Sequence, residues 1–323
     1  MTDAEAIVRF PCFGGRCAVI VAGDGPAGSP RRAAAQARQR LLEWHGRFSR
    51  FIAGSELSLL NADARASVRV SPLMAYLVAI IRQAGEVTSG LVDATMPGEL
   101  RRAGYDDELP PRLPLALALA LAPQRRPAGP APAARWRELR VDHARSTVTR
   151  PPGLQLDSGG LAKGMFADVL AETLSGHESF AVDCGGDLAI GGSGARERTI
   201  EVQSPFDGSV IHAFRLARAG VATSGISRRA WLGADGRPAH HLLDPATGRP
   251  AYTGVVQATA LAPTAALAEV HAKAAVLSGP RAGERWLRWG GVLVLDDGSR
   301  RVIEAGGPRR QRATDRGLAT AAA

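Results

Sequence analysis

The chain is organised around one short stretch, residues 157–168, which reads DSGGLAKGMFAD. It follows a strand-like run at 154–156 and leads into a predicted helix at 166–174, so an acid, two glycines and a lysine share one turn. Glycine lets a ligand approach the backbone because it has no Cβ. The free N–H groups at a helix start favour an anion, and Lys163 adds a full positive charge. The stretch therefore predicts a diphosphate site, although a tight turn with a solvated lysine also explains the pattern taken alone.

Lysine is scarce in this chain. Of its 40 lysine and arginine residues only two are lysines, Lys163 and Lys273, and arginine supplies all the others. A compact ammonium and a planar guanidinium are not interchangeable at a tight site. The scarcity therefore favours a functional role for both lysines.

The overall composition is that of a globular protein. With 323 residues, 45% of them hydrophobic and 22% charged, the chain is long enough to bury a large core. Its formal charge of +9 suits an anionic ligand or a nucleic acid. However, the arginines are scattered and aromatic residues make up only 5%, so the stacking platforms of a single-strand binder are missing. We expect no nucleic-acid partner.

The cysteines and the N-terminal residues bear on redox chemistry and location. Cys12, Cys17 and Cys184 form neither a metal-ligand pattern nor a disulfide framework. Residues 1–9 contain two acids and no hydrophobic core of signal-peptide length. The apolar run at 115–122 is too short to span a bilayer. These features predict a cytoplasmic protein without membrane insertion.

Hydrophobic periodicity predicts a mixture of helices and strands. The main predicted helices are residues 31–47, 72–85 and 265–277, with a short helix after Ser55, which together with Ser58 indicates an N-cap. The main predicted strands are residues 18–21, 180–182, 199–203, 212–216, 220–223 and 291–296. This mixture predicts an α/β fold, in its α+β form, with mixed sheets and packed helices.

The domain organisation predicted from composition is simple. Residues 12–305 form one domain, preceded by an N-terminal tail at 1–11. The proline- and alanine-rich segment near 108–134 is a peripheral helical insertion. Residues 306–323, rich in arginine, glycine and alanine, have the composition of a disordered C-terminal tail.

Two further patterns accompany the opening stretch. A second Asp-X-Gly-Gly turn, Asp183 to Gly186, follows the predicted strand at 180–182, which suggests that one ligand is held from two sides. The predicted helix at 265–277 carries Glu269 and Lys273 four residues apart, hence on one face.

Six segments, taken together and in this order, resemble the ApbE family, the FAD:protein FMN transferases. They are SRF with GSELS within 49–58, GLVD at 90–93, DSGGLAKG at 157–164, DCGGD at 183–187, ATSG at 222–225 and HLLDPATG at 241–248. The resemblance implies the ApbE-like fold and a transferase that cleaves the FAD pyrophosphate. It also implies that FMN is attached through a phosphoester to a Thr or Ser of an acceptor flavoprotein (protein flavinylation), while AMP leaves.

The resemblance also implies roles for individual residues. The expected FAD contacts are Phe13, Phe51, Leu91, Val92, Asp93, Asp157, Lys163, Thr223, Ser224 and His241. The expected catalytic residues are Lys163, His241, Asp244 and Lys273, with the general base unassigned. The expected magnesium position is formed by the backbone carbonyl of Gly160 with residues 269 and 273. Among the other histidines, His271 is predicted to be a packing residue, and the spacing to Asp244 favours His241 over His240 for the site.

The metal position departs from the family pattern. The resemblance implies Asp at position 269 and Thr at position 273, whereas this chain has Glu269 and Lys273. A charged lysine cannot ligate Mg²⁺ because an ammonium has only donors. One hypothesis is that Lys273 occupies the metal's place, pairs with Glu269 and gives its charge to the diphosphate. The alternative is an ordinary exposed i,i+4 pair on a helix surface.

Two other functions are compatible with the same residues. The chain is either a transferase, an FAD-binding protein that has lost transfer, or an FAD pyrophosphatase that releases FMN and AMP to water. The Glu269 and Lys273 departure is the argument for lost transfer, and it leaves the need for Mg²⁺ open.

Overall fold

The computed structural model describes residues 5–105, 112–194, 196–233 and 235–305. Its main element is an eight-stranded sheet in the order β1-β2-β6-β7-β10-β15-β16-β17, in which every neighbouring pair is antiparallel. The strands are β1 (Ala6–Cys12), β2 (Gly15–Ala22), β6 (Ser179–Cys184), β7 (Asp187–Gly191), β10 (Ala219–Gly225), β15 (Val255–Ala262), β16 (Gly291–Leu295) and β17 (Arg300–Ile303). This is the α+β form of the predicted fold class.

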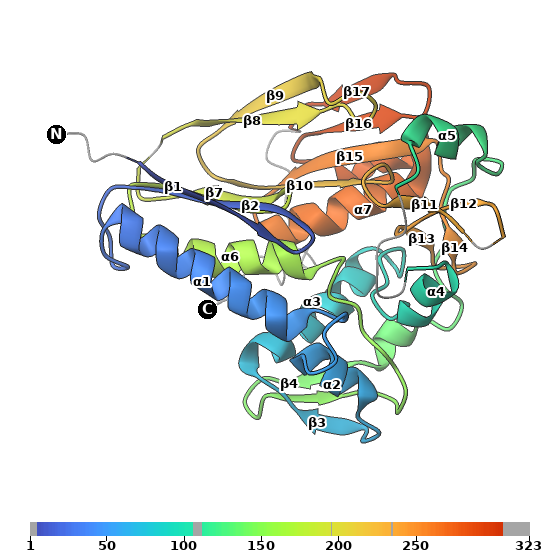
Figure 1. The fold of residues 1–323 in the computed structure, drawn as a ribbon, viewed down its shortest axis with the longest axis horizontal. Helices are drawn as coiled ribbons and strands as arrows, with labels where there is room; N and C mark the ends of the chain where they lie inside the picture. Colours follow the sequence, from blue (N-terminus) through green and yellow to red (C-terminus); the bar gives the residue numbers. More distant parts are fainter. Residues whose placement is uncertain (1–4, 106–111, 195, 234, 306–323) are drawn as a thin grey trace.

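Three long helices cover one face of this sheet (Figure 1). They are α1 (Pro30–Phe48), α6 (Ala162–Leu174) and α7 (Ala265–Ala282). The hairpin of β8 (Arg198–Gln203) and β9 (Val210–Leu216) packs on the opposite face, over a smaller apolar cluster that includes Val221 and Leu261. Because β15 and most of α7 are buried all round, the main core lies between the sheet and the helices.

A second group of elements lies below the helices in Figure 1. It contains α2 (Glu56–Ala62), α3 (Pro72–Val87) and the small sheet β3 (Ser67–Arg69), β5 (Thr147–Thr149) and β4 (Arg140–Asp142). The buried Arg150 donates hydrogen bonds to the backbone carbonyls of Leu60 and Asp63. Arg150 thereby anchors the segment that leads to residue 157.

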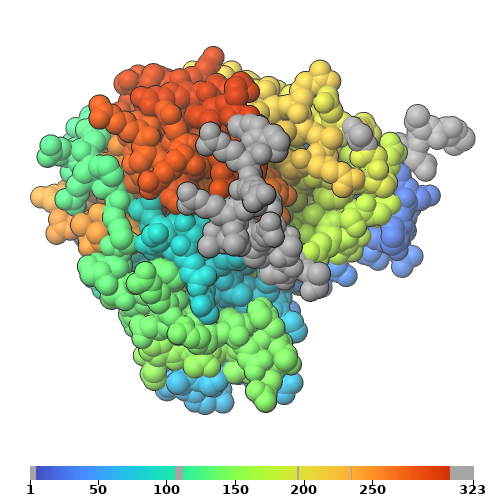
Figure 2. All heavy atoms as spheres, turned by 180° about the vertical axis from the view of Figure 1, so that it is seen from behind, coloured from blue at the N-terminus to red at the C-terminus, as the bar shows by residue number. Residues whose placement is uncertain are grey.

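Short elements complete the fold. They are α4 (Pro97–Arg102), α5 (Leu115–Ala120), the 3-10 helices η1 (Arg135–Glu138) and η2 (Gly283–Trp286), and the ribbons β11 (Ala230–Leu232) with β12 (Pro238–His240) and β13 (Leu243–Asp244) with β14 (Arg249–Pro250). Segment 112–150, which carries α5, appears as green spheres on the outer surface in Figure 2. In this segment Leu113 and Ala118 pack on Ala230 of β11.

Several predicted elements are confirmed, and three expectations need correction. Residues 6–11 belong to β1, which pairs with β2 along its whole length, so they are not a tail. Residues 154–156 are not a strand, because Asn61 bonds the backbone N–H and C=O of Leu156 with its side-chain amide at 2.8 Å each. Helix α6 begins at Ala162, so Lys163 lies in its first turn.

The predicted tail 306–323 lies outside the described residues. In the described ranges, no helix combines the length and apolar composition needed to cross a bilayer.

Helix α6 fixes the position of α7 through two contacts. The carboxylate of Asp168 accepts hydrogen bonds from the backbone N–H groups of Ala265 and Ala266, at 2.8 and 2.9 Å. Gly164 faces the same turn so closely that a Cβ there would lie 2.6 Å from the carbonyl oxygen of Ala265. The first turns of α6 and α7 are therefore held together, which brings Lys163 close to Glu269.

The Asp168 carboxylate at the start of α7 provides a pH-dependent prediction. Burial raises the pKa of Asp168 to about 7, above the ~3.9 of an exposed aspartate. The folded chain thus holds this proton more tightly than the unfolded chain between these values, and its contribution to stability falls as pH rises towards 7. From pH 5 to 8 we expect the unfolding free energy of the wild type to fall by about 2 kcal/mol relative to Asp168→Asn.

Urea unfolding of both proteins at each pH measures this difference. Asp297→Asn is the control, since that exposed carboxylate has its pKa lowered by hydrogen bonds with Ser299 and stays charged throughout the range. If the unfolding free energies of the wild type and Asp168→Asn change in parallel with pH, the buried carboxyl of Asp168 does not titrate between pH 5 and 8.

Candidate active site

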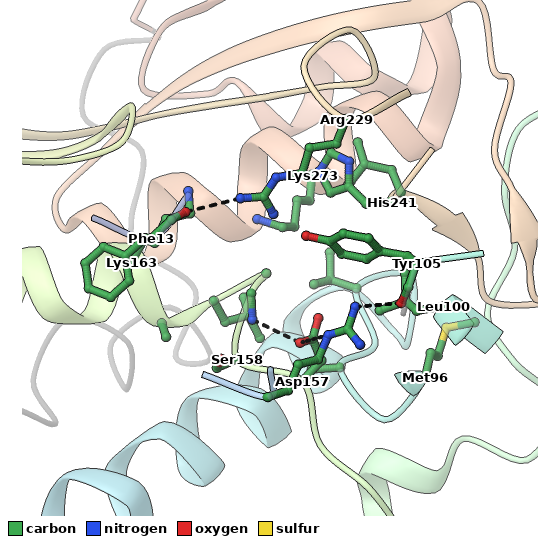
Figure 3. Close-up of a pocket in the computed structure, with 18 of the residues that line it drawn as sticks. Phe13, Met96, Leu100, Tyr105, Asp157, Ser158, Lys163, Arg229, His241 and Lys273 are labelled. Carbon is green, nitrogen blue, oxygen red and sulfur yellow. Dashed lines mark hydrogen bonds and ion pairs between the residues drawn. The ribbon is translucent and has the colours of Figure 1, made fainter. Parts of the chain in front are cut away.

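A cavity of about 460 Å³ lies where the glycine turn at 157–164 meets α7 and the loops after α1 and α3. Its lining comes from parts of the chain that are far apart in the sequence: 13–14, 45–52, 91–105, 157–166, Arg229, 241–245 and the α7 side chains of Lys273 and Leu277. In Figure 3, Lys273, Arg229 and His241 lie along one side and Asp157 along the other, with the Tyr105 ring between them. The volume is within the range of small-molecule sites.

Most of the residues predicted for the site line this cavity. They are Phe13, Phe51, Leu91, Val92, Asp93, Asp157, Gly160, Lys163, His241 and Lys273. Glu269 lies directly behind Lys273 and is fully buried. The glycine turn and helix α7, which are about 110 residues apart in the sequence, therefore meet at one site.

Both lysines pair with buried carboxylates. Lys163 Nζ bonds Asp187 and lies 3.9 Å from Glu269 Oε1. Lys273 Nζ donates to the same Glu269 oxygen at 3.0 Å, and the backbone N–H of Gly164 donates to Glu269 Oε2 at 2.9 Å. The side chains of Lys163 and Lys273 are 19% and 11% exposed, so each ammonium reaches the cavity from a mostly buried stem. The alternative of an exposed surface pair at 269 and 273 is wrong.

The charges of this network stabilise one another. Burial acts to lower the pKa of Lys163, but the carboxylates of Asp187 and Glu269 outweigh it and raise that pKa. Burial raises the pKa of Glu269, but Lys273 and Lys163 outweigh it and lower that pKa. Burial, followed by the negative charge of Glu269, raises the pKa of Asp187 to about 6. At neutral pH Lys163 is therefore cationic beside the ionised carboxylates of Asp187 and Glu269.

An aromatic wall, formed by Phe51 and Tyr105 with Arg50, also lines the cavity. The Arg50 guanidinium is 4.2 Å from the centroid of the Phe51 ring and 4.6 Å from that of Tyr105. Arg50 also pairs with Asp157 at 3.4 Å and donates to the backbone carbonyl of Tyr105 at 2.9 Å. Phe51 is 42% exposed, so its ring is available to a ligand. Such a wall suits a flat, electron-rich ring system.

Arg229 and His241 form the remaining polar corner. Arg229 donates to the backbone carbonyl of Phe13 at 3.3 Å (Figure 3). Burial, and then the charge of Arg229, lower the pKa of His241 well below its usual value, so its imidazole is neutral at physiological pH. His240 instead packs on Tyr252 in the core, and His271 is buried and stacks on Trp289, as predicted for His271.

Four expected residues do not line the cavity. Thr223 bonds the hydroxyl of Thr259 on the neighbouring strand, and Ser224 is buried on the same strand, β10. The carboxylate of Asp244 accepts hydrogen bonds from the backbone of Gly129 and Ala246 and from the Thr247 hydroxyl, so it organises a turn. The fourth is Glu269, behind Lys273. The second glycine turn reaches the site through Asp187, and its glycines lie outside the lining.

Sequence reasoning missed four residues that the structure brings to the site: Arg50, Tyr105, Asp187 and Arg229. Arg50 and Asp187 stand inside segments that were already singled out, at 49–58 and 183–187, so a signal existed for these two. Nothing distinguishes Arg229 from the other arginines, or Tyr105 from the other tyrosines, before the fold is known.

Comparison with known proteins shows to which family this chain belongs. Residues 13–295 match the model of the ApbE family. The chain belongs to the ApbE family. It is 28% identical over 234 residues to the FAD:protein FMN transferase of Salmonella typhimurium, an alignment that covers 70% of this chain and 65% of that protein. It is 33% identical over 141 residues to the enzyme of that name in Treponema pallidum, covering 39% of each. The chain thus spans less than two thirds of these relatives' lengths.

A solved structure supports the family assignment. The crystal structure of the ApbE protein of Thermotoga maritima matches with a TM-score of 0.73 and 25% sequence identity, and the match covers 93% of this chain and 97% of that one. The predicted ApbE-like fold is therefore confirmed.

Proposed function

We infer that this ApbE-family chain is an FAD:protein FMN transferase. Its substrate is FAD, and its partner is an acceptor flavoprotein that offers a Ser or Thr hydroxyl. The observation that carries this proposal is the convergence of both lysines of the chain on one cavity beside the glycine turn. The relatives that bear this activity in their names support it. We retain a cytoplasmic location as a prediction.

The two sides of the cavity suit the two parts of FAD. Lys163, Lys273 and Arg229 offer positive charge to the diphosphate. The wall made by Arg50, Phe51 and Tyr105 offers stacking surface to a ring of the dinucleotide. The cationic groups and the aromatic wall come from different elements. The cavity can therefore hold FAD both at its diphosphate and at one of its rings.

The reaction then needs positioning and charge more than covalent chemistry. The acceptor oxygen attacks the phosphorus of the FMN half, and the bond from that phosphorus to the bridging oxygen breaks, so AMP leaves with this oxygen. Negative charge that develops on the phosphoryl and bridging oxygens is stabilised by the ammonium groups of Lys163 and Lys273. His241, which is neutral, can accept the hydroxyl proton as the new bond forms.

The test is a transfer assay with FAD and a panel of acceptor proteins that carry Ser/Thr flavinylation motifs. Transfer gives in-gel flavin fluorescence on the acceptor and one AMP per attached FMN. An acceptor with its Ser or Thr changed to Ala is the control and stays dark. Free FMN and AMP without labelled acceptor would indicate the pyrophosphatase, and bound FAD without any product would indicate a binding protein.

The aromatic wall gives a prediction for FAD affinity. Arg50→Lys keeps the positive charge beside Asp157 but loses the planar group that lies over Phe51 and Tyr105. We expect about a tenfold increase in the Kd for FAD, which corresponds to ~1.4 kcal/mol. Fluorescence titration measures it, with Arg47→Lys as the control, since Arg47 forms a partly exposed ion pair with Glu56 outside the lining. An unchanged Kd would show that the wall does not contact FAD.

A further inference from the structure

We propose that Lys273 supplies, as a fixed part of the protein, the positive charge that a divalent cation would bring to the diphosphate, so that this chain works without a metal. The proposal rests on the function proposed above. It concerns the corner of the cavity formed by the glycine turn and α7, where Gly160, Glu269 and Lys273 meet.

The position of Lys273 is the first argument. Its ammonium lies 3.0 Å from Oε1 of the fully buried Glu269, one turn back on α7. Its stem passes so close to the glycine turn that a Cβ on Gly160 would lie 3.2 Å from Lys273 Cε. Lys273 also lines the cavity, where Figure 3 draws it beside Arg229. The ammonium therefore lies between the buried carboxylate and the turn that faces the ligand.

The ligand set is the second argument, because it does not fit Mg²⁺. Magnesium requires about six oxygen ligands at about 2.0–2.1 Å. Residue 273 offers only N–H donors. Both oxygens of Glu269 are already used, Oε1 by Lys273 and Oε2 by the backbone N–H of Gly164. Within the described ranges, no group of three or more His, Cys, Asp or Glu side chains is placed to hold a metal ion.

Electrostatic repulsion is the third argument. An ion bound to Glu269 Oε1 at about 2.1 Å would lie no more than about 5 Å from the Lys273 ammonium, which contacts the same oxygen. Lys163 lies 3.9 Å from this oxygen as well. The two ammonium groups beside this oxygen repel a further cation.

The chemistry remains balanced without a metal. The acceptor oxygen forms a bond to the FMN phosphorus, the bridging P–O bond breaks, AMP takes the bridging oxygen with its electron pair, and the hydroxyl proton passes to His241 and then to solvent. Lys273 keeps its proton throughout and acts only through its charge and its hydrogen bonds. No further reactant is needed.

The test compares FAD binding and transfer in EDTA and in added Mg²⁺. We expect the wild type to bind FAD with the same Kd, within twofold, under both conditions, and calorimetric titration with Mg²⁺ alone to give no binding. Lys273→Met is expected to weaken FAD binding at least tenfold. The double variant Glu269→Gln with Lys273→Met leaves no unpaired charge on α7, and we expect it to weaken FAD binding by the same factor. Glu269→Asp with Lys273→Thr is expected to bind Mg²⁺ and to need it.

The outcomes separate the two proposals. If the wild type binds FAD or transfers FMN only when Mg²⁺ is added, the metal-free inference is wrong and the transferase proposal stands. If the wild type binds FAD equally with and without Mg²⁺ but Lys273→Met and the double variant match it, Lys273 does not serve the diphosphate. If FAD does not bind under any condition, both proposals fail.

Discussion

Replacement of Lys163 by alanine is expected to lower kcat/KM for FMN transfer by about 10³-fold or more. The ammonium lines the cavity beside the glycine turn and is held there by Asp187 and Glu269. Removal of one donor or charge that stabilises a developing oxyanion costs about 10²–10³ in rate in a preorganised site. Lys163 also contributes to FAD binding, so we expect the loss in kcat/KM to lie at the upper end. Steady-state transfer kinetics with varied FAD measure it.

Loss of stability must be separated from loss of charge. Lys163→Ala leaves Asp187 buried without its partner, which costs about 3–5 kcal/mol of stability. Lys163→Met combined with Asp187→Asn removes both charges and keeps the volume of both side chains. We expect this double variant to regain most of the stability and none of the transfer. Wild-type transfer by a stable double variant would contradict the role of Lys163.

Gly164→Ala is expected to destabilise the fold by about 3 kcal/mol, although alanine normally favours helices. A Cβ at this position would lie 2.6 to 2.8 Å from backbone atoms of Ala265 and Ala266, which no side-chain rotation relieves. The backbone N–H of Gly164 also donates to Glu269. Separation of α6 from α7 would therefore displace Glu269 and Lys273 together, and FAD binding should weaken with stability.

A matched control exists in α1. Gly46 has no atom within 4 Å of the place a Cβ would take. Gly46→Ala should leave the protein equally stable or stabilise it by up to about 1 kcal/mol. Urea unfolding of the two variants measures the difference, and equal midpoints would show that the α6–α7 approach at Gly164 is less tight than described.

The sequence predicts best those features that local patterns determine. Helices α1 and α3 follow from apolar spacing, and the cap of α2 from Ser55, whose hydroxyl accepts the backbone N–H of Ser58 at 3.0 Å. The order of six short segments leads to the family and to ten of the lining residues. The scarcity of lysine leads to both lysines of the site.

Features that depend on tertiary contacts are not predictable in this way. Asp187 was visible as part of a glycine turn, but its pairing with Lys163 depends on how β7 packs against α6. Asp244 has the appearance of a catalytic acid in the sequence. Only the fold shows that its carboxylate accepts hydrogen bonds from the backbone of Gly129 and the hydroxyl of Thr247. Thr223 lies on β10, and its hydroxyl forms a hydrogen bond with the hydroxyl of Thr259 on β15. For Asp244 and Thr223 the residue type is correct for chemistry, and the surroundings assign it to structure.

Strand β1 shows the same limit at the level of elements. Its sequence, AIVRFPC, contains a proline and lies almost entirely within the predicted tail at 1–11, and local reading gives no strand. Its position at the edge of the sheet tolerates the proline. Pairing with β2 in full register then makes it part of the fold.

The most direct measurement of the central claim is a crystal structure of the chain with FAD, grown in EDTA. The account predicts that the diphosphate lies between the Lys163 and Lys273 ammonium groups, within hydrogen-bond distance of both, with one ring of FAD against Phe51 and Tyr105. A diphosphate bound away from both lysines, or FAD that enters the cavity only together with a divalent cation at Glu269, would contradict it.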